Sequence, residues 1–218
     1  RTGRALSAFG GLLALNQRQR AGGIQRTHPK QKTMGNFSGK SLPVPPDQPR
    51  STFAGAEEQM ADNETMPEKI LRVAAAQVKF RPTLSENVAL IRQFIAHSAR
   101  AGCDVVLFPE CALTGYNVDF RRITRGGVED GLKAVADAAR THRRHVLIGA
   151  PTFAGQHRFN SLLVFDRQGR ERFRYHKIHL TPRDAKIFAP GNSVALFRID
   201  GVYCTAILCH ERRYPELV

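Results

Sequence analysis

From residue 70 onward, short apolar runs alternate with amphipathic segments, and this alternation constrains the fold more than any other feature of the sequence. Short apolar runs bounded by turn residues are typical of buried strands, whereas apolar residues that recur every three or four positions predict helices. The predicted order is strand 70–78, helix 83–102, strand 104–108, helix 128–142, and then strands 145–150, 161–166, 171–178, 194–199 and 203–209.

The first predicted helix has the clearest boundaries. Thr83 and Glu86 have the spacing of a capping box, in which the hydroxyl and the carboxylate each accept a hydrogen bond from a backbone N–H at the helix start. Gly102 supplies the C-terminal stop. Because two helices lie between strands and a strand-rich stretch follows, the sequence predicts an α/β protein.

Residues 1–69 have a different character. They are rich in Gly, Gln, Arg, Ser and Pro, with prolines crowded between 43 and 49 and no sustained periodicity. Such a composition buries too little apolar surface to offset the entropy of ordering, so we predict a disordered tail. At its start Arg1 and Arg4 precede the apolar stretch 5–15, which leaves a targeting segment or a non-native extension open.

The net charge of +14 is spread unevenly along the chain. Residues 1–46 hold eight Lys and Arg and no acidic residue, whereas residues 70–218 hold 23 basic and 13 acidic residues. A basic excess of this size can draw a protein to nucleic acid or anionic membranes. The arginines are mostly single and follow no nucleic-acid-binding motif, which favours a solvated basic surface with no nucleic-acid partner.

Several kinds of protein and site are excluded or disfavoured. No apolar run approaches the ~20 residues of a transmembrane helix, so we expect no membrane partner. The four cysteines form no CxxC pair, which favours reduced thiols and a cytoplasmic location. Neither GxGxxG nor GxxxxGKS/T occurs. A metal site built on His176, His179 and His210 is disfavoured, because the first two would point to opposite faces of one strand. We expect no metal and no cofactor.

Three reactive side chains stand at or near the ends of predicted strands. Glu110 follows VVLFP, Lys177 lies in RYHKIHL, and Cys209 closes TAILC. Ligands bind at the carboxyl ends of strands in open α/β sheets. Taken singly, each residue has an ordinary interpretation, as a solvated carboxylate, a surface lysine and a packed thiol. Together they suit acyl transfer, in which a carboxylate takes the thiol proton and an ammonium stabilises the oxyanion.

Three sequence blocks carry these residues in a fixed order: LFPECALTGY (107–116), RYHKIHL (174–180) and ILCHERRYPEL (207–217). Through them the chain resembles the carbon–nitrogen hydrolase (nitrilase-like) superfamily, whose members use a Glu–Lys–Cys triad. The blocks AAAQV, NSLLVFDRQGR (160–170) and FAPGNS (188–193) add to the likeness, which covers residues 70–218.

The resemblance implies a role for each residue. Glu110 is expected to be the general base, Lys177 the cation that stabilises the oxyanion, and Cys209 the nucleophile. The backbone N–H of His210 would be the second oxyanion donor. The implied reaction is hydrolysis of an amide or N-carbamoyl bond of a small molecule through a Cys209 thioester, with nitrile hydrolysis less favoured.

Two further acidic positions depart from the family pattern. Family members often have a Glu six residues before the Pro of the PG turn; that place holds Asp184, one methylene shorter, which leaves open whether a second carboxylate assists. Glu211 stands two residues past the nucleophile, where Asp is common. The remaining cysteines match nothing catalytic and are interpreted as packing or neutral positions: Cys103, Cys111 and Cys204.

The resemblance also implies the family's αββα sandwich. That sandwich continues well beyond the nucleophile, whereas this sequence stops at Val218, so we expect a fold incomplete at its C-terminus with an open edge strand. Residues 1–69 would be the tail and 70–218 the N-terminal part of the hydrolase domain, with a homo-oligomer expected for the full-length protein. The alternatives are a truncated non-catalytic domain and a basic anion- or nucleic-acid-binding protein.

Two arginines follow the nucleophile closely. Arg212 and Arg213 come three and four residues after Cys209, and we expect one of them to face the substrate. An Arg can hold a carboxylate through two parallel hydrogen bonds, and the RR-aromatic-PE arrangement is similar to that of superfamily enzymes that cleave N-carbamoyl amino acids. The other interpretation is that one arginine pairs with Glu211 or Glu216 and braces the loop.

Overall fold

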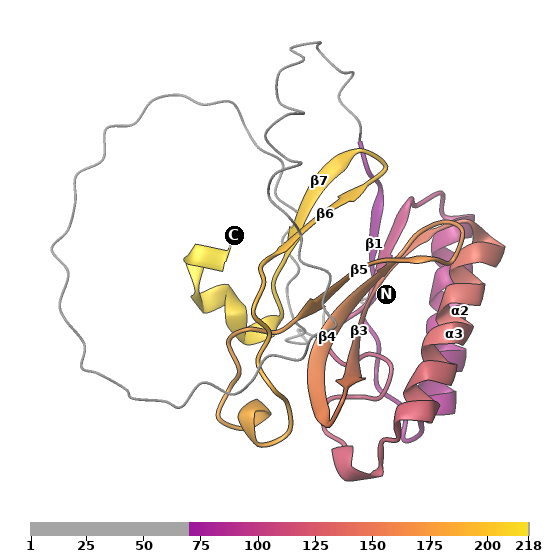
Figure 1. Cartoon of the computed structure of the whole chain (residues 1–218). Helices are drawn as coiled ribbons and strands as arrows, with labels where there is room; N and C mark the ends of the chain where they lie inside the picture. Colours follow the sequence, from indigo (N-terminus) through magenta and orange to yellow (C-terminus); the bar gives the residue numbers. More distant parts are fainter. Residues whose placement is uncertain (1–69, 218) are drawn as a thin grey trace, which may run out of the picture. The chain divides into compact units, whose positions relative to one another are not determined.

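The structure is a computed structural model and describes residues 70–217 of the 218-residue chain. The expected disordered tail and targeting segment lie outside the described residues. A five-stranded sheet forms the centre of the described part, in the order β1-β2-β3-β4-β5 (Figure 1). The first three strands run parallel and the last two are antiparallel to their neighbours. The strands are β1 (Val73–Ala75), β2 (Val105–Leu107), β3 (His145–Ala154), β4 (His157–Phe165) and β5 (Glu171–His176).

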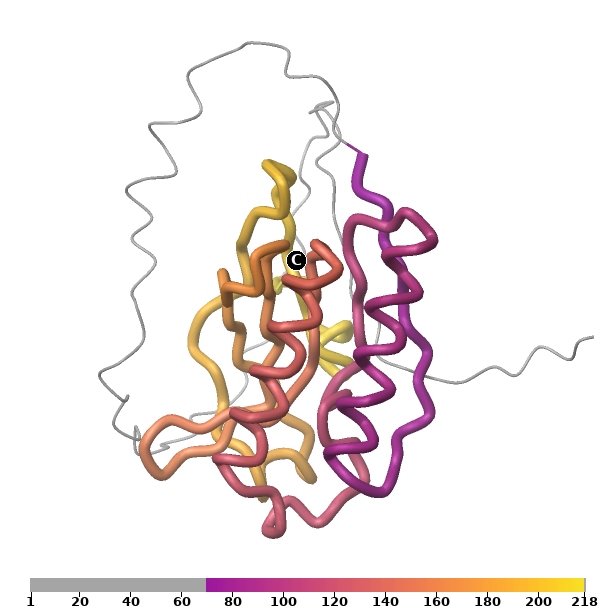
Figure 2. Tube along the Cα trace, turned by 90° about the vertical axis from the view of Figure 1, so that its right-hand side faces the viewer, coloured from indigo at the N-terminus to yellow at the C-terminus, as the bar shows by residue number. Residues whose placement is uncertain are grey.

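Two helices, α2 (Leu84–Arg100) and α3 (Arg125–His142), cover one face of this sheet and lie side by side (Figure 2). The predicted capping box at the start of α2 is confirmed, with Thr83 and Glu86 each binding the other's backbone N–H. The core on this face consists of helix side chains packed on alternate strand residues, among them Ile91, Ile95, Leu132, Val135, Val106, Val146, Ile148 and Leu163.

The hairpin of β6 (Ala195–Ile199) and β7 (Val202–Ala206) covers the opposite face of the sheet. Successive strand residues point to opposite faces, so Val105 packs on the hairpin while Val106 packs on the helices. The predicted α/β class is therefore confirmed. The described residues supply one helical layer and two sheet layers of the predicted αββα sandwich.

Several predicted boundaries differ from the structure. β1 is shorter than the predicted strand 70–78, α3 begins at Arg125 instead of residue 128, and β4 begins at His157 instead of residue 161. The ends of β3, β5 and β7 differ as well. β3 continues past residue 150 to Ala154, because its pairing with β4 continues through Pro151. β5 ends at His176, so Lys177 lies just beyond the strand. β7 ends at Ala206, and Cys209 lies in a 3-10 turn instead of closing the strand. The 3-10 turns are η2 (Phe120–Arg122), η3 (Asp184–Lys186), η4 (Cys209–Arg213) and η5 (Pro215–Leu217).

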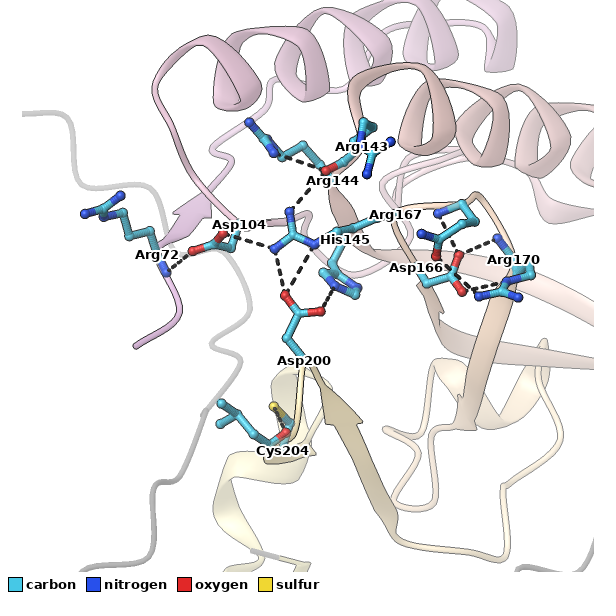
Figure 3. Close-up of polar contacts among 12 residues, drawn as sticks. Arg72, Asp104, Arg143, Arg144, His145, Asp166, Arg167, Arg170, Asp200 and Cys204 are labelled. Carbon is cyan, nitrogen blue, oxygen red and sulfur yellow. Dashed lines mark hydrogen bonds and ion pairs between the residues drawn. The ribbon is translucent and has the colours of Figure 1, made fainter. Parts of the chain in front are cut away.

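A group of charged side chains joins the hairpin to the sheet at the end where β2 and β3 begin (Figure 3). The Arg167 guanidinium lies 3.0 Å from the Asp104 carboxylate and 2.7 Å from that of Asp200. Asp200, in the turn between β6 and β7, also lies 2.9 Å from His145 Nε2. We call these four residues the Arg167 network. Among the described residues, no helix is both long and apolar enough to cross a membrane.

Candidate active site

The three predicted catalytic residues come together around the opposite end of the sheet. Glu110 follows the carboxyl end of β2, and Lys177 follows that of β5, which runs in the same direction as β2. Cys209 begins η4, beyond β7. Lys177 Nζ donates a 2.7 Å hydrogen bond to Glu110 Oε1, and both side chains act electrostatically on the Cys209 thiol. Segments far apart in the sequence thus form one cluster.

A close backbone approach fixes the position of Glu110. A Cβ atom on Gly149, in β3, would lie 2.5 Å from the carbonyl oxygen of Pro109 and 2.7 Å from Glu110 Cα. Real structures do not tolerate such contacts, so only glycine fits there. Cys111, directly after Glu110, has φ of 52°, in the left-handed region that non-glycine residues seldom adopt. The backbone around Glu110 is therefore determined by its packing against β3.

Lys177 lies between two carboxylates. Its Nζ donates to Asp184 Oδ2 at 2.8 Å as well as to Glu110 Oε1. Burial is nearly complete, with side-chain exposures of 0% for Lys177, 8% for Glu110 and 2% for Asp184. The Tyr116 hydroxyl donates to Asp184 Oδ1 at 2.5 Å and satisfies its second oxygen. One ammonium and two carboxylates give this buried group a net charge of −1.

The pKa values of Lys177 and Asp184 are shifted because the ammonium is paired with buried carboxylates. Burial by itself lowers the pKa of Lys177, but the charges of Glu110 and Asp184 and their hydrogen bonds outweigh it, so the pKa is raised and the ammonium stays protonated. Burial raises the pKa of Asp184, but hydrogen bonds from Lys177 and Tyr116 outweigh that effect and the pKa is lowered. Both groups therefore remain charged at neutral pH.

Asn160, in β4, orients Glu110 and was not identified as a site residue from the sequence. The fully buried Asn160 donates from Nδ2 to Glu110 Oε1 at 2.8 Å, and its Oδ1 lies 3.6 Å from the Cys111 sulfur. Its backbone carbonyl accepts from the Lys177 N–H at 2.9 Å. The signal available in the sequence was a lone amide at the head of the apolar run NSLLVF.

The Cys209 thiol is half-buried and lies close to the charged group. Burial raises its pKa, and the negative charge of Glu110 and a hydrogen bond to that carboxylate raise it further. The positive charges of Lys177 and Arg212 act in the opposite direction but do not prevail. The resting sulfur is therefore a protonated thiol beside a carboxylate. Cys209 has φ of 48°, again in the left-handed region.

The other residues predicted near Cys209 occupy different surroundings. His210 is half-buried, and its ring contacts Tyr214 edge-on. Arg212 and Arg213 are both exposed. Of the two, Arg212 is the one whose charge acts on the Cys209 thiol. Within residues 70–217, no ion pair joins either arginine to Glu211 or Glu216, so the structure does not bear out the bracing interpretation.

The histidines are engaged in separate contacts. His176 Nδ1 lies 2.7 Å from Ser161 Oγ, and burial lowers the pKa of His176 to about 4. His179 instead stacks on the Tyr214 ring, with the centroids 3.9 Å apart. The described part of the chain contains no group of three or more His, Cys, Asp or Glu side chains placed to hold a metal ion.

Comparison with known proteins assigns the chain to a family. The carbon-nitrogen hydrolase family model matches residues 72–218, and the chain belongs to that family. The chain is 27% identical over 140 residues to a 2-oxoglutaramate amidase of Bacillus subtilis, covering 62% of this chain and 53% of that protein. It is 26% identical over 159 residues to an omega-amidase of Homo sapiens, covering 67% and 57%. It thus spans about half the length of the curated relatives that it matches.

Solved structures agree on the fold. An amidase from Nesterenkonia sp. superposes with a TM-score of 0.64 at 22% identity, over 67% of this chain and 58% of that one. A variant of the same amidase, covering 68% of this chain and 61% of that one at a TM-score of 0.64 and 21% identity, shows Michael addition of acrylamide at its active-site cysteine.

Proposed function

We propose that this chain carries the catalytic centre of an amidase that cleaves amide or N-carbamoyl bonds of small molecules through a thioester on Cys209. The observation that carries the proposal is the protonated Cys209 thiol beside the Glu110 carboxylate, which Lys177 holds at 2.7 Å. The amidase names of the relatives and the reactive cysteine of the Nesterenkonia amidase support it.

Glu110 is suited to act as the base because of how its oxygens are used. Lys177 and Asn160 both donate to Oε1, and among the described residues Oε2 accepts no hydrogen bond from a nitrogen or hydroxyl donor. The two donors fix the orientation of the carboxylate through Oε1, while Oε2 stays available to the thiol. Transfer of the thiol proton to Glu110 leaves the net charge of the buried group and the thiol unchanged, and only moves the negative charge to sulfur.

The reaction then proceeds in two halves. The Cys209 thiolate attacks the amide carbon, and the Lys177 ammonium and the His210 backbone N–H stabilise the charge that moves onto oxygen. Glu110 gives its proton to the leaving nitrogen, the C–N bond breaks, and a thioester remains. Glu110 next takes a proton from water, whose oxygen attacks the thioester. The acid leaves, and the proton returns to sulfur.

Of Arg212 and Arg213, Arg212 is the better candidate for binding a substrate carboxylate. It is exposed, and its positive charge acts on the Cys209 thiol. A guanidinium near the reacting sulfur can hold a carboxylate bidentately and so select acidic amides or N-carbamoyl amino acids. Nitriles remain the less favoured substrates.

The test of the proposed function compares Cys209→Ala with Cys103→Ala in the full chain. Wild type and Cys103→Ala should release ammonia from amides or N-carbamoyl amino acids, whereas Cys209→Ala should release none, because no other group can form the thioester. Mass spectrometry of wild type quenched with substrate should show the added acyl group on the Cys209 peptide. Turnover above a trace in Cys209→Ala would overturn the assignment.

Three further expectations accompany this proposal: association of the full-length protein into a homo-oligomer, a cytoplasmic location, and no binding to nucleic acid. Light scattering tests the first and fractionation of cells the second. The third is tested by a titration with DNA and RNA at several salt concentrations, since a basic protein that does bind them shows a steep salt dependence.

A further inference from the structure

Glu211 is a buried carboxylate that the proposed reaction does not use. Its side chain has 0% exposure, and it lies two residues past the nucleophile. Among the described residues it forms no ion pair. Four neutral donors satisfy it instead: the Tyr175 hydroxyl at 2.7 Å, the N–H of Ile178 at 2.7 Å, the N–H of His179 at 3.2 Å and the N–H of Leu208 at 2.7 Å.

These four hydrogen bonds connect two segments of the site. Oε1 accepts from Ile178 and His179, which directly follow Lys177. Oε2 accepts from Leu208, which directly precedes Cys209. The Glu211 side chain therefore links the backbone next to Lys177, through Oε1, to the backbone next to Cys209, through Oε2.

The turn that contains Cys209 has a strained backbone, which must be held in place by contacts with other segments. A φ of 48° at a non-glycine residue costs conformational energy and persists only where surrounding contacts impose it. Hydrogen bonds to an ionised acceptor are about twice as strong as neutral ones. A buried carboxylate that accepts from both segments is thus suited to hold the strained turn in place.

We infer that Glu211 is a positioning residue that holds the Cys209 turn against the Lys177 segment and thereby places the thiol beside Glu110. This inference rests on the proposed function for its importance to catalysis, but the placement itself can be measured without turnover. Glu, and not the shorter Asp common at this family position, has the length with which this chain spans the two segments.

The test is the pH profile of Cys209 alkylation by iodoacetamide in the full chain, followed on the Cys209 peptide by mass spectrometry. The charged groups acting on this thiol are Glu110, Lys177 and Arg212. Glu211→Gln keeps the volume but turns an N–H₂ toward a backbone donor. The thiol should then move away from Glu110 and out of its buried place, and the pH at which alkylation is half-maximal should fall toward that of an ordinary Cys thiol.

Tyr175→Phe is the matched control, because it removes one donor from the same carboxylate and leaves all three backbone hydrogen bonds. Its alkylation midpoint should equal that of wild type even if its unfolding midpoint falls. In Glu211→Gln, kcat should fall about tenfold or more through misplacement of the nucleophile, with KM little changed. Glu211→Asp, which retains the charge, should give an intermediate midpoint.

An unchanged midpoint in both Glu211 variants, or the same shift in Tyr175→Phe, would overturn the inference. Loss of cooperative unfolding in both Glu211 variants would overturn it too, since Glu211 would then determine folding and not the place of the thiol. If the Glu211 variants shift the alkylation midpoint but the wild-type protein hydrolyses no amide, the proposed function is rejected and the positioning role of Glu211 is retained.

Discussion

The two ends of the central sheet each hold a cation between two carboxylates, but in different surroundings. At one end Lys177 lies between Glu110 and Asp184 with side-chain exposures of 0%, 8% and 2%. At the other end Arg167 lies between Asp104 and Asp200 with exposures of 23%, 31% and 24%. The arrangement of charges is the same, and the main difference is access to water.

This difference determines what each group can do. Around Arg167, water screens the charges, so the network mainly holds the β6–β7 turn to the sheet (Figure 3). Around Lys177, little water can compensate for an unpaired charge, so each charge depends on the others. Because the charges depend on one another, a change in charge at one of these side chains alters the pKa of its neighbours. Proton transfer from the Cys209 thiol to Glu110 would depend on this coupling.

The largest expected difference is between Lys177→Met and Arg167→Met. Lys177→Met leaves two buried carboxylates facing each other without a cation, which should cost about 3–5 kcal/mol of unfolding free energy and abolish hydrolysis. Arg167→Met should cost about 1 kcal/mol and leave hydrolysis intact. Denaturant unfolding and ammonia release measure the two effects.

The pH dependence of Lys177→Met offers a further check. Without the ammonium, the folded-state pKa values of the carboxylates rise above their unfolded values. The variant should therefore regain stability relative to wild type as pH falls through those raised values to about 4 and below. Substantial kcat in this variant would show that Lys177 is structural and would remove the functional contrast between the two ends.

A second pair of variants compares close backbone contacts at the two ends. In Gly149→Ala the new Cβ would meet the backbone on both sides of Glu110, so kcat/KM should fall about 10²-fold through displacement of the base. In Gly169→Ala the Cβ would collide with the carbonyl oxygen of Ala136, and φ of 75° adds strain. Both should lose about 1–3 kcal/mol of stability, but only the first should lose activity. Equal kcat/KM values in the two would contradict the proposed role of Gly149.

A third comparison tests substrate selection, and it concerns only the end of the sheet where Glu110, Lys177 and Cys209 lie. For matched amides with and without a carboxylate, Arg212→Ala should reduce the preference in kcat/KM for the acidic substrate about tenfold, the effect of losing one charged hydrogen-bonding group. Arg213→Ala should change the preference less, because the charge of Arg212 is the one that acts on the Cys209 thiol. If neither substitution narrows the gap, the arginines do not bind the carboxylate.

The smallest expected effect belongs to Asp200→Asn in the Arg167 network. Burial raises the pKa of Asp200, but hydrogen bonds from Arg167 and His145 outweigh it and the pKa is lowered. A lowered pKa gives stability that is present above the ordinary Asp value of about 3.9 and lost as pH falls through the folded value. The variant should therefore be about 1 kcal/mol less stable near pH 7, with the difference disappearing in acid. If the stability difference between wild type and Asp200→Asn persists in acid, its cause is packing and not the charge of Asp200.

The sequence predicts local structure best where a signal and its partner are close together. The capping box of Thr83 and Glu86 is complete within four residues, so the start of α2 could be predicted. The end of β3 could not, because Pro151 and Gly149 are typical of turns and their pairing partners in β4 override that preference. Local propensity decides such boundaries only when distant contacts are weak.

The site follows the same principle. Glu110, Lys177 and Cys209 could be proposed from the motifs that contain them, because each is a residue type with a distinctive chemistry. Asn160 could not, since an amide in a strand is ordinary until its contact with Glu110 is seen. The position of Cys209 in a turn beyond β7 also depends on the distant partners of Glu211.

The wide separation of these residues along the chain has a consequence for folding. Helix α2 and its capping box form from local contacts, which close quickly, whereas contacts that span long loops close late. The contact between Glu110 and Lys177 spans 67 residues, and Cys209 lies still further along the chain, beyond the β6–β7 hairpin. We therefore expect the thiol to keep an ordinary reactivity in partly folded chains and to acquire its raised pKa when the segment that carries it packs against Glu110 and Lys177. Its alkylation rate during refolding would report when this segment docks.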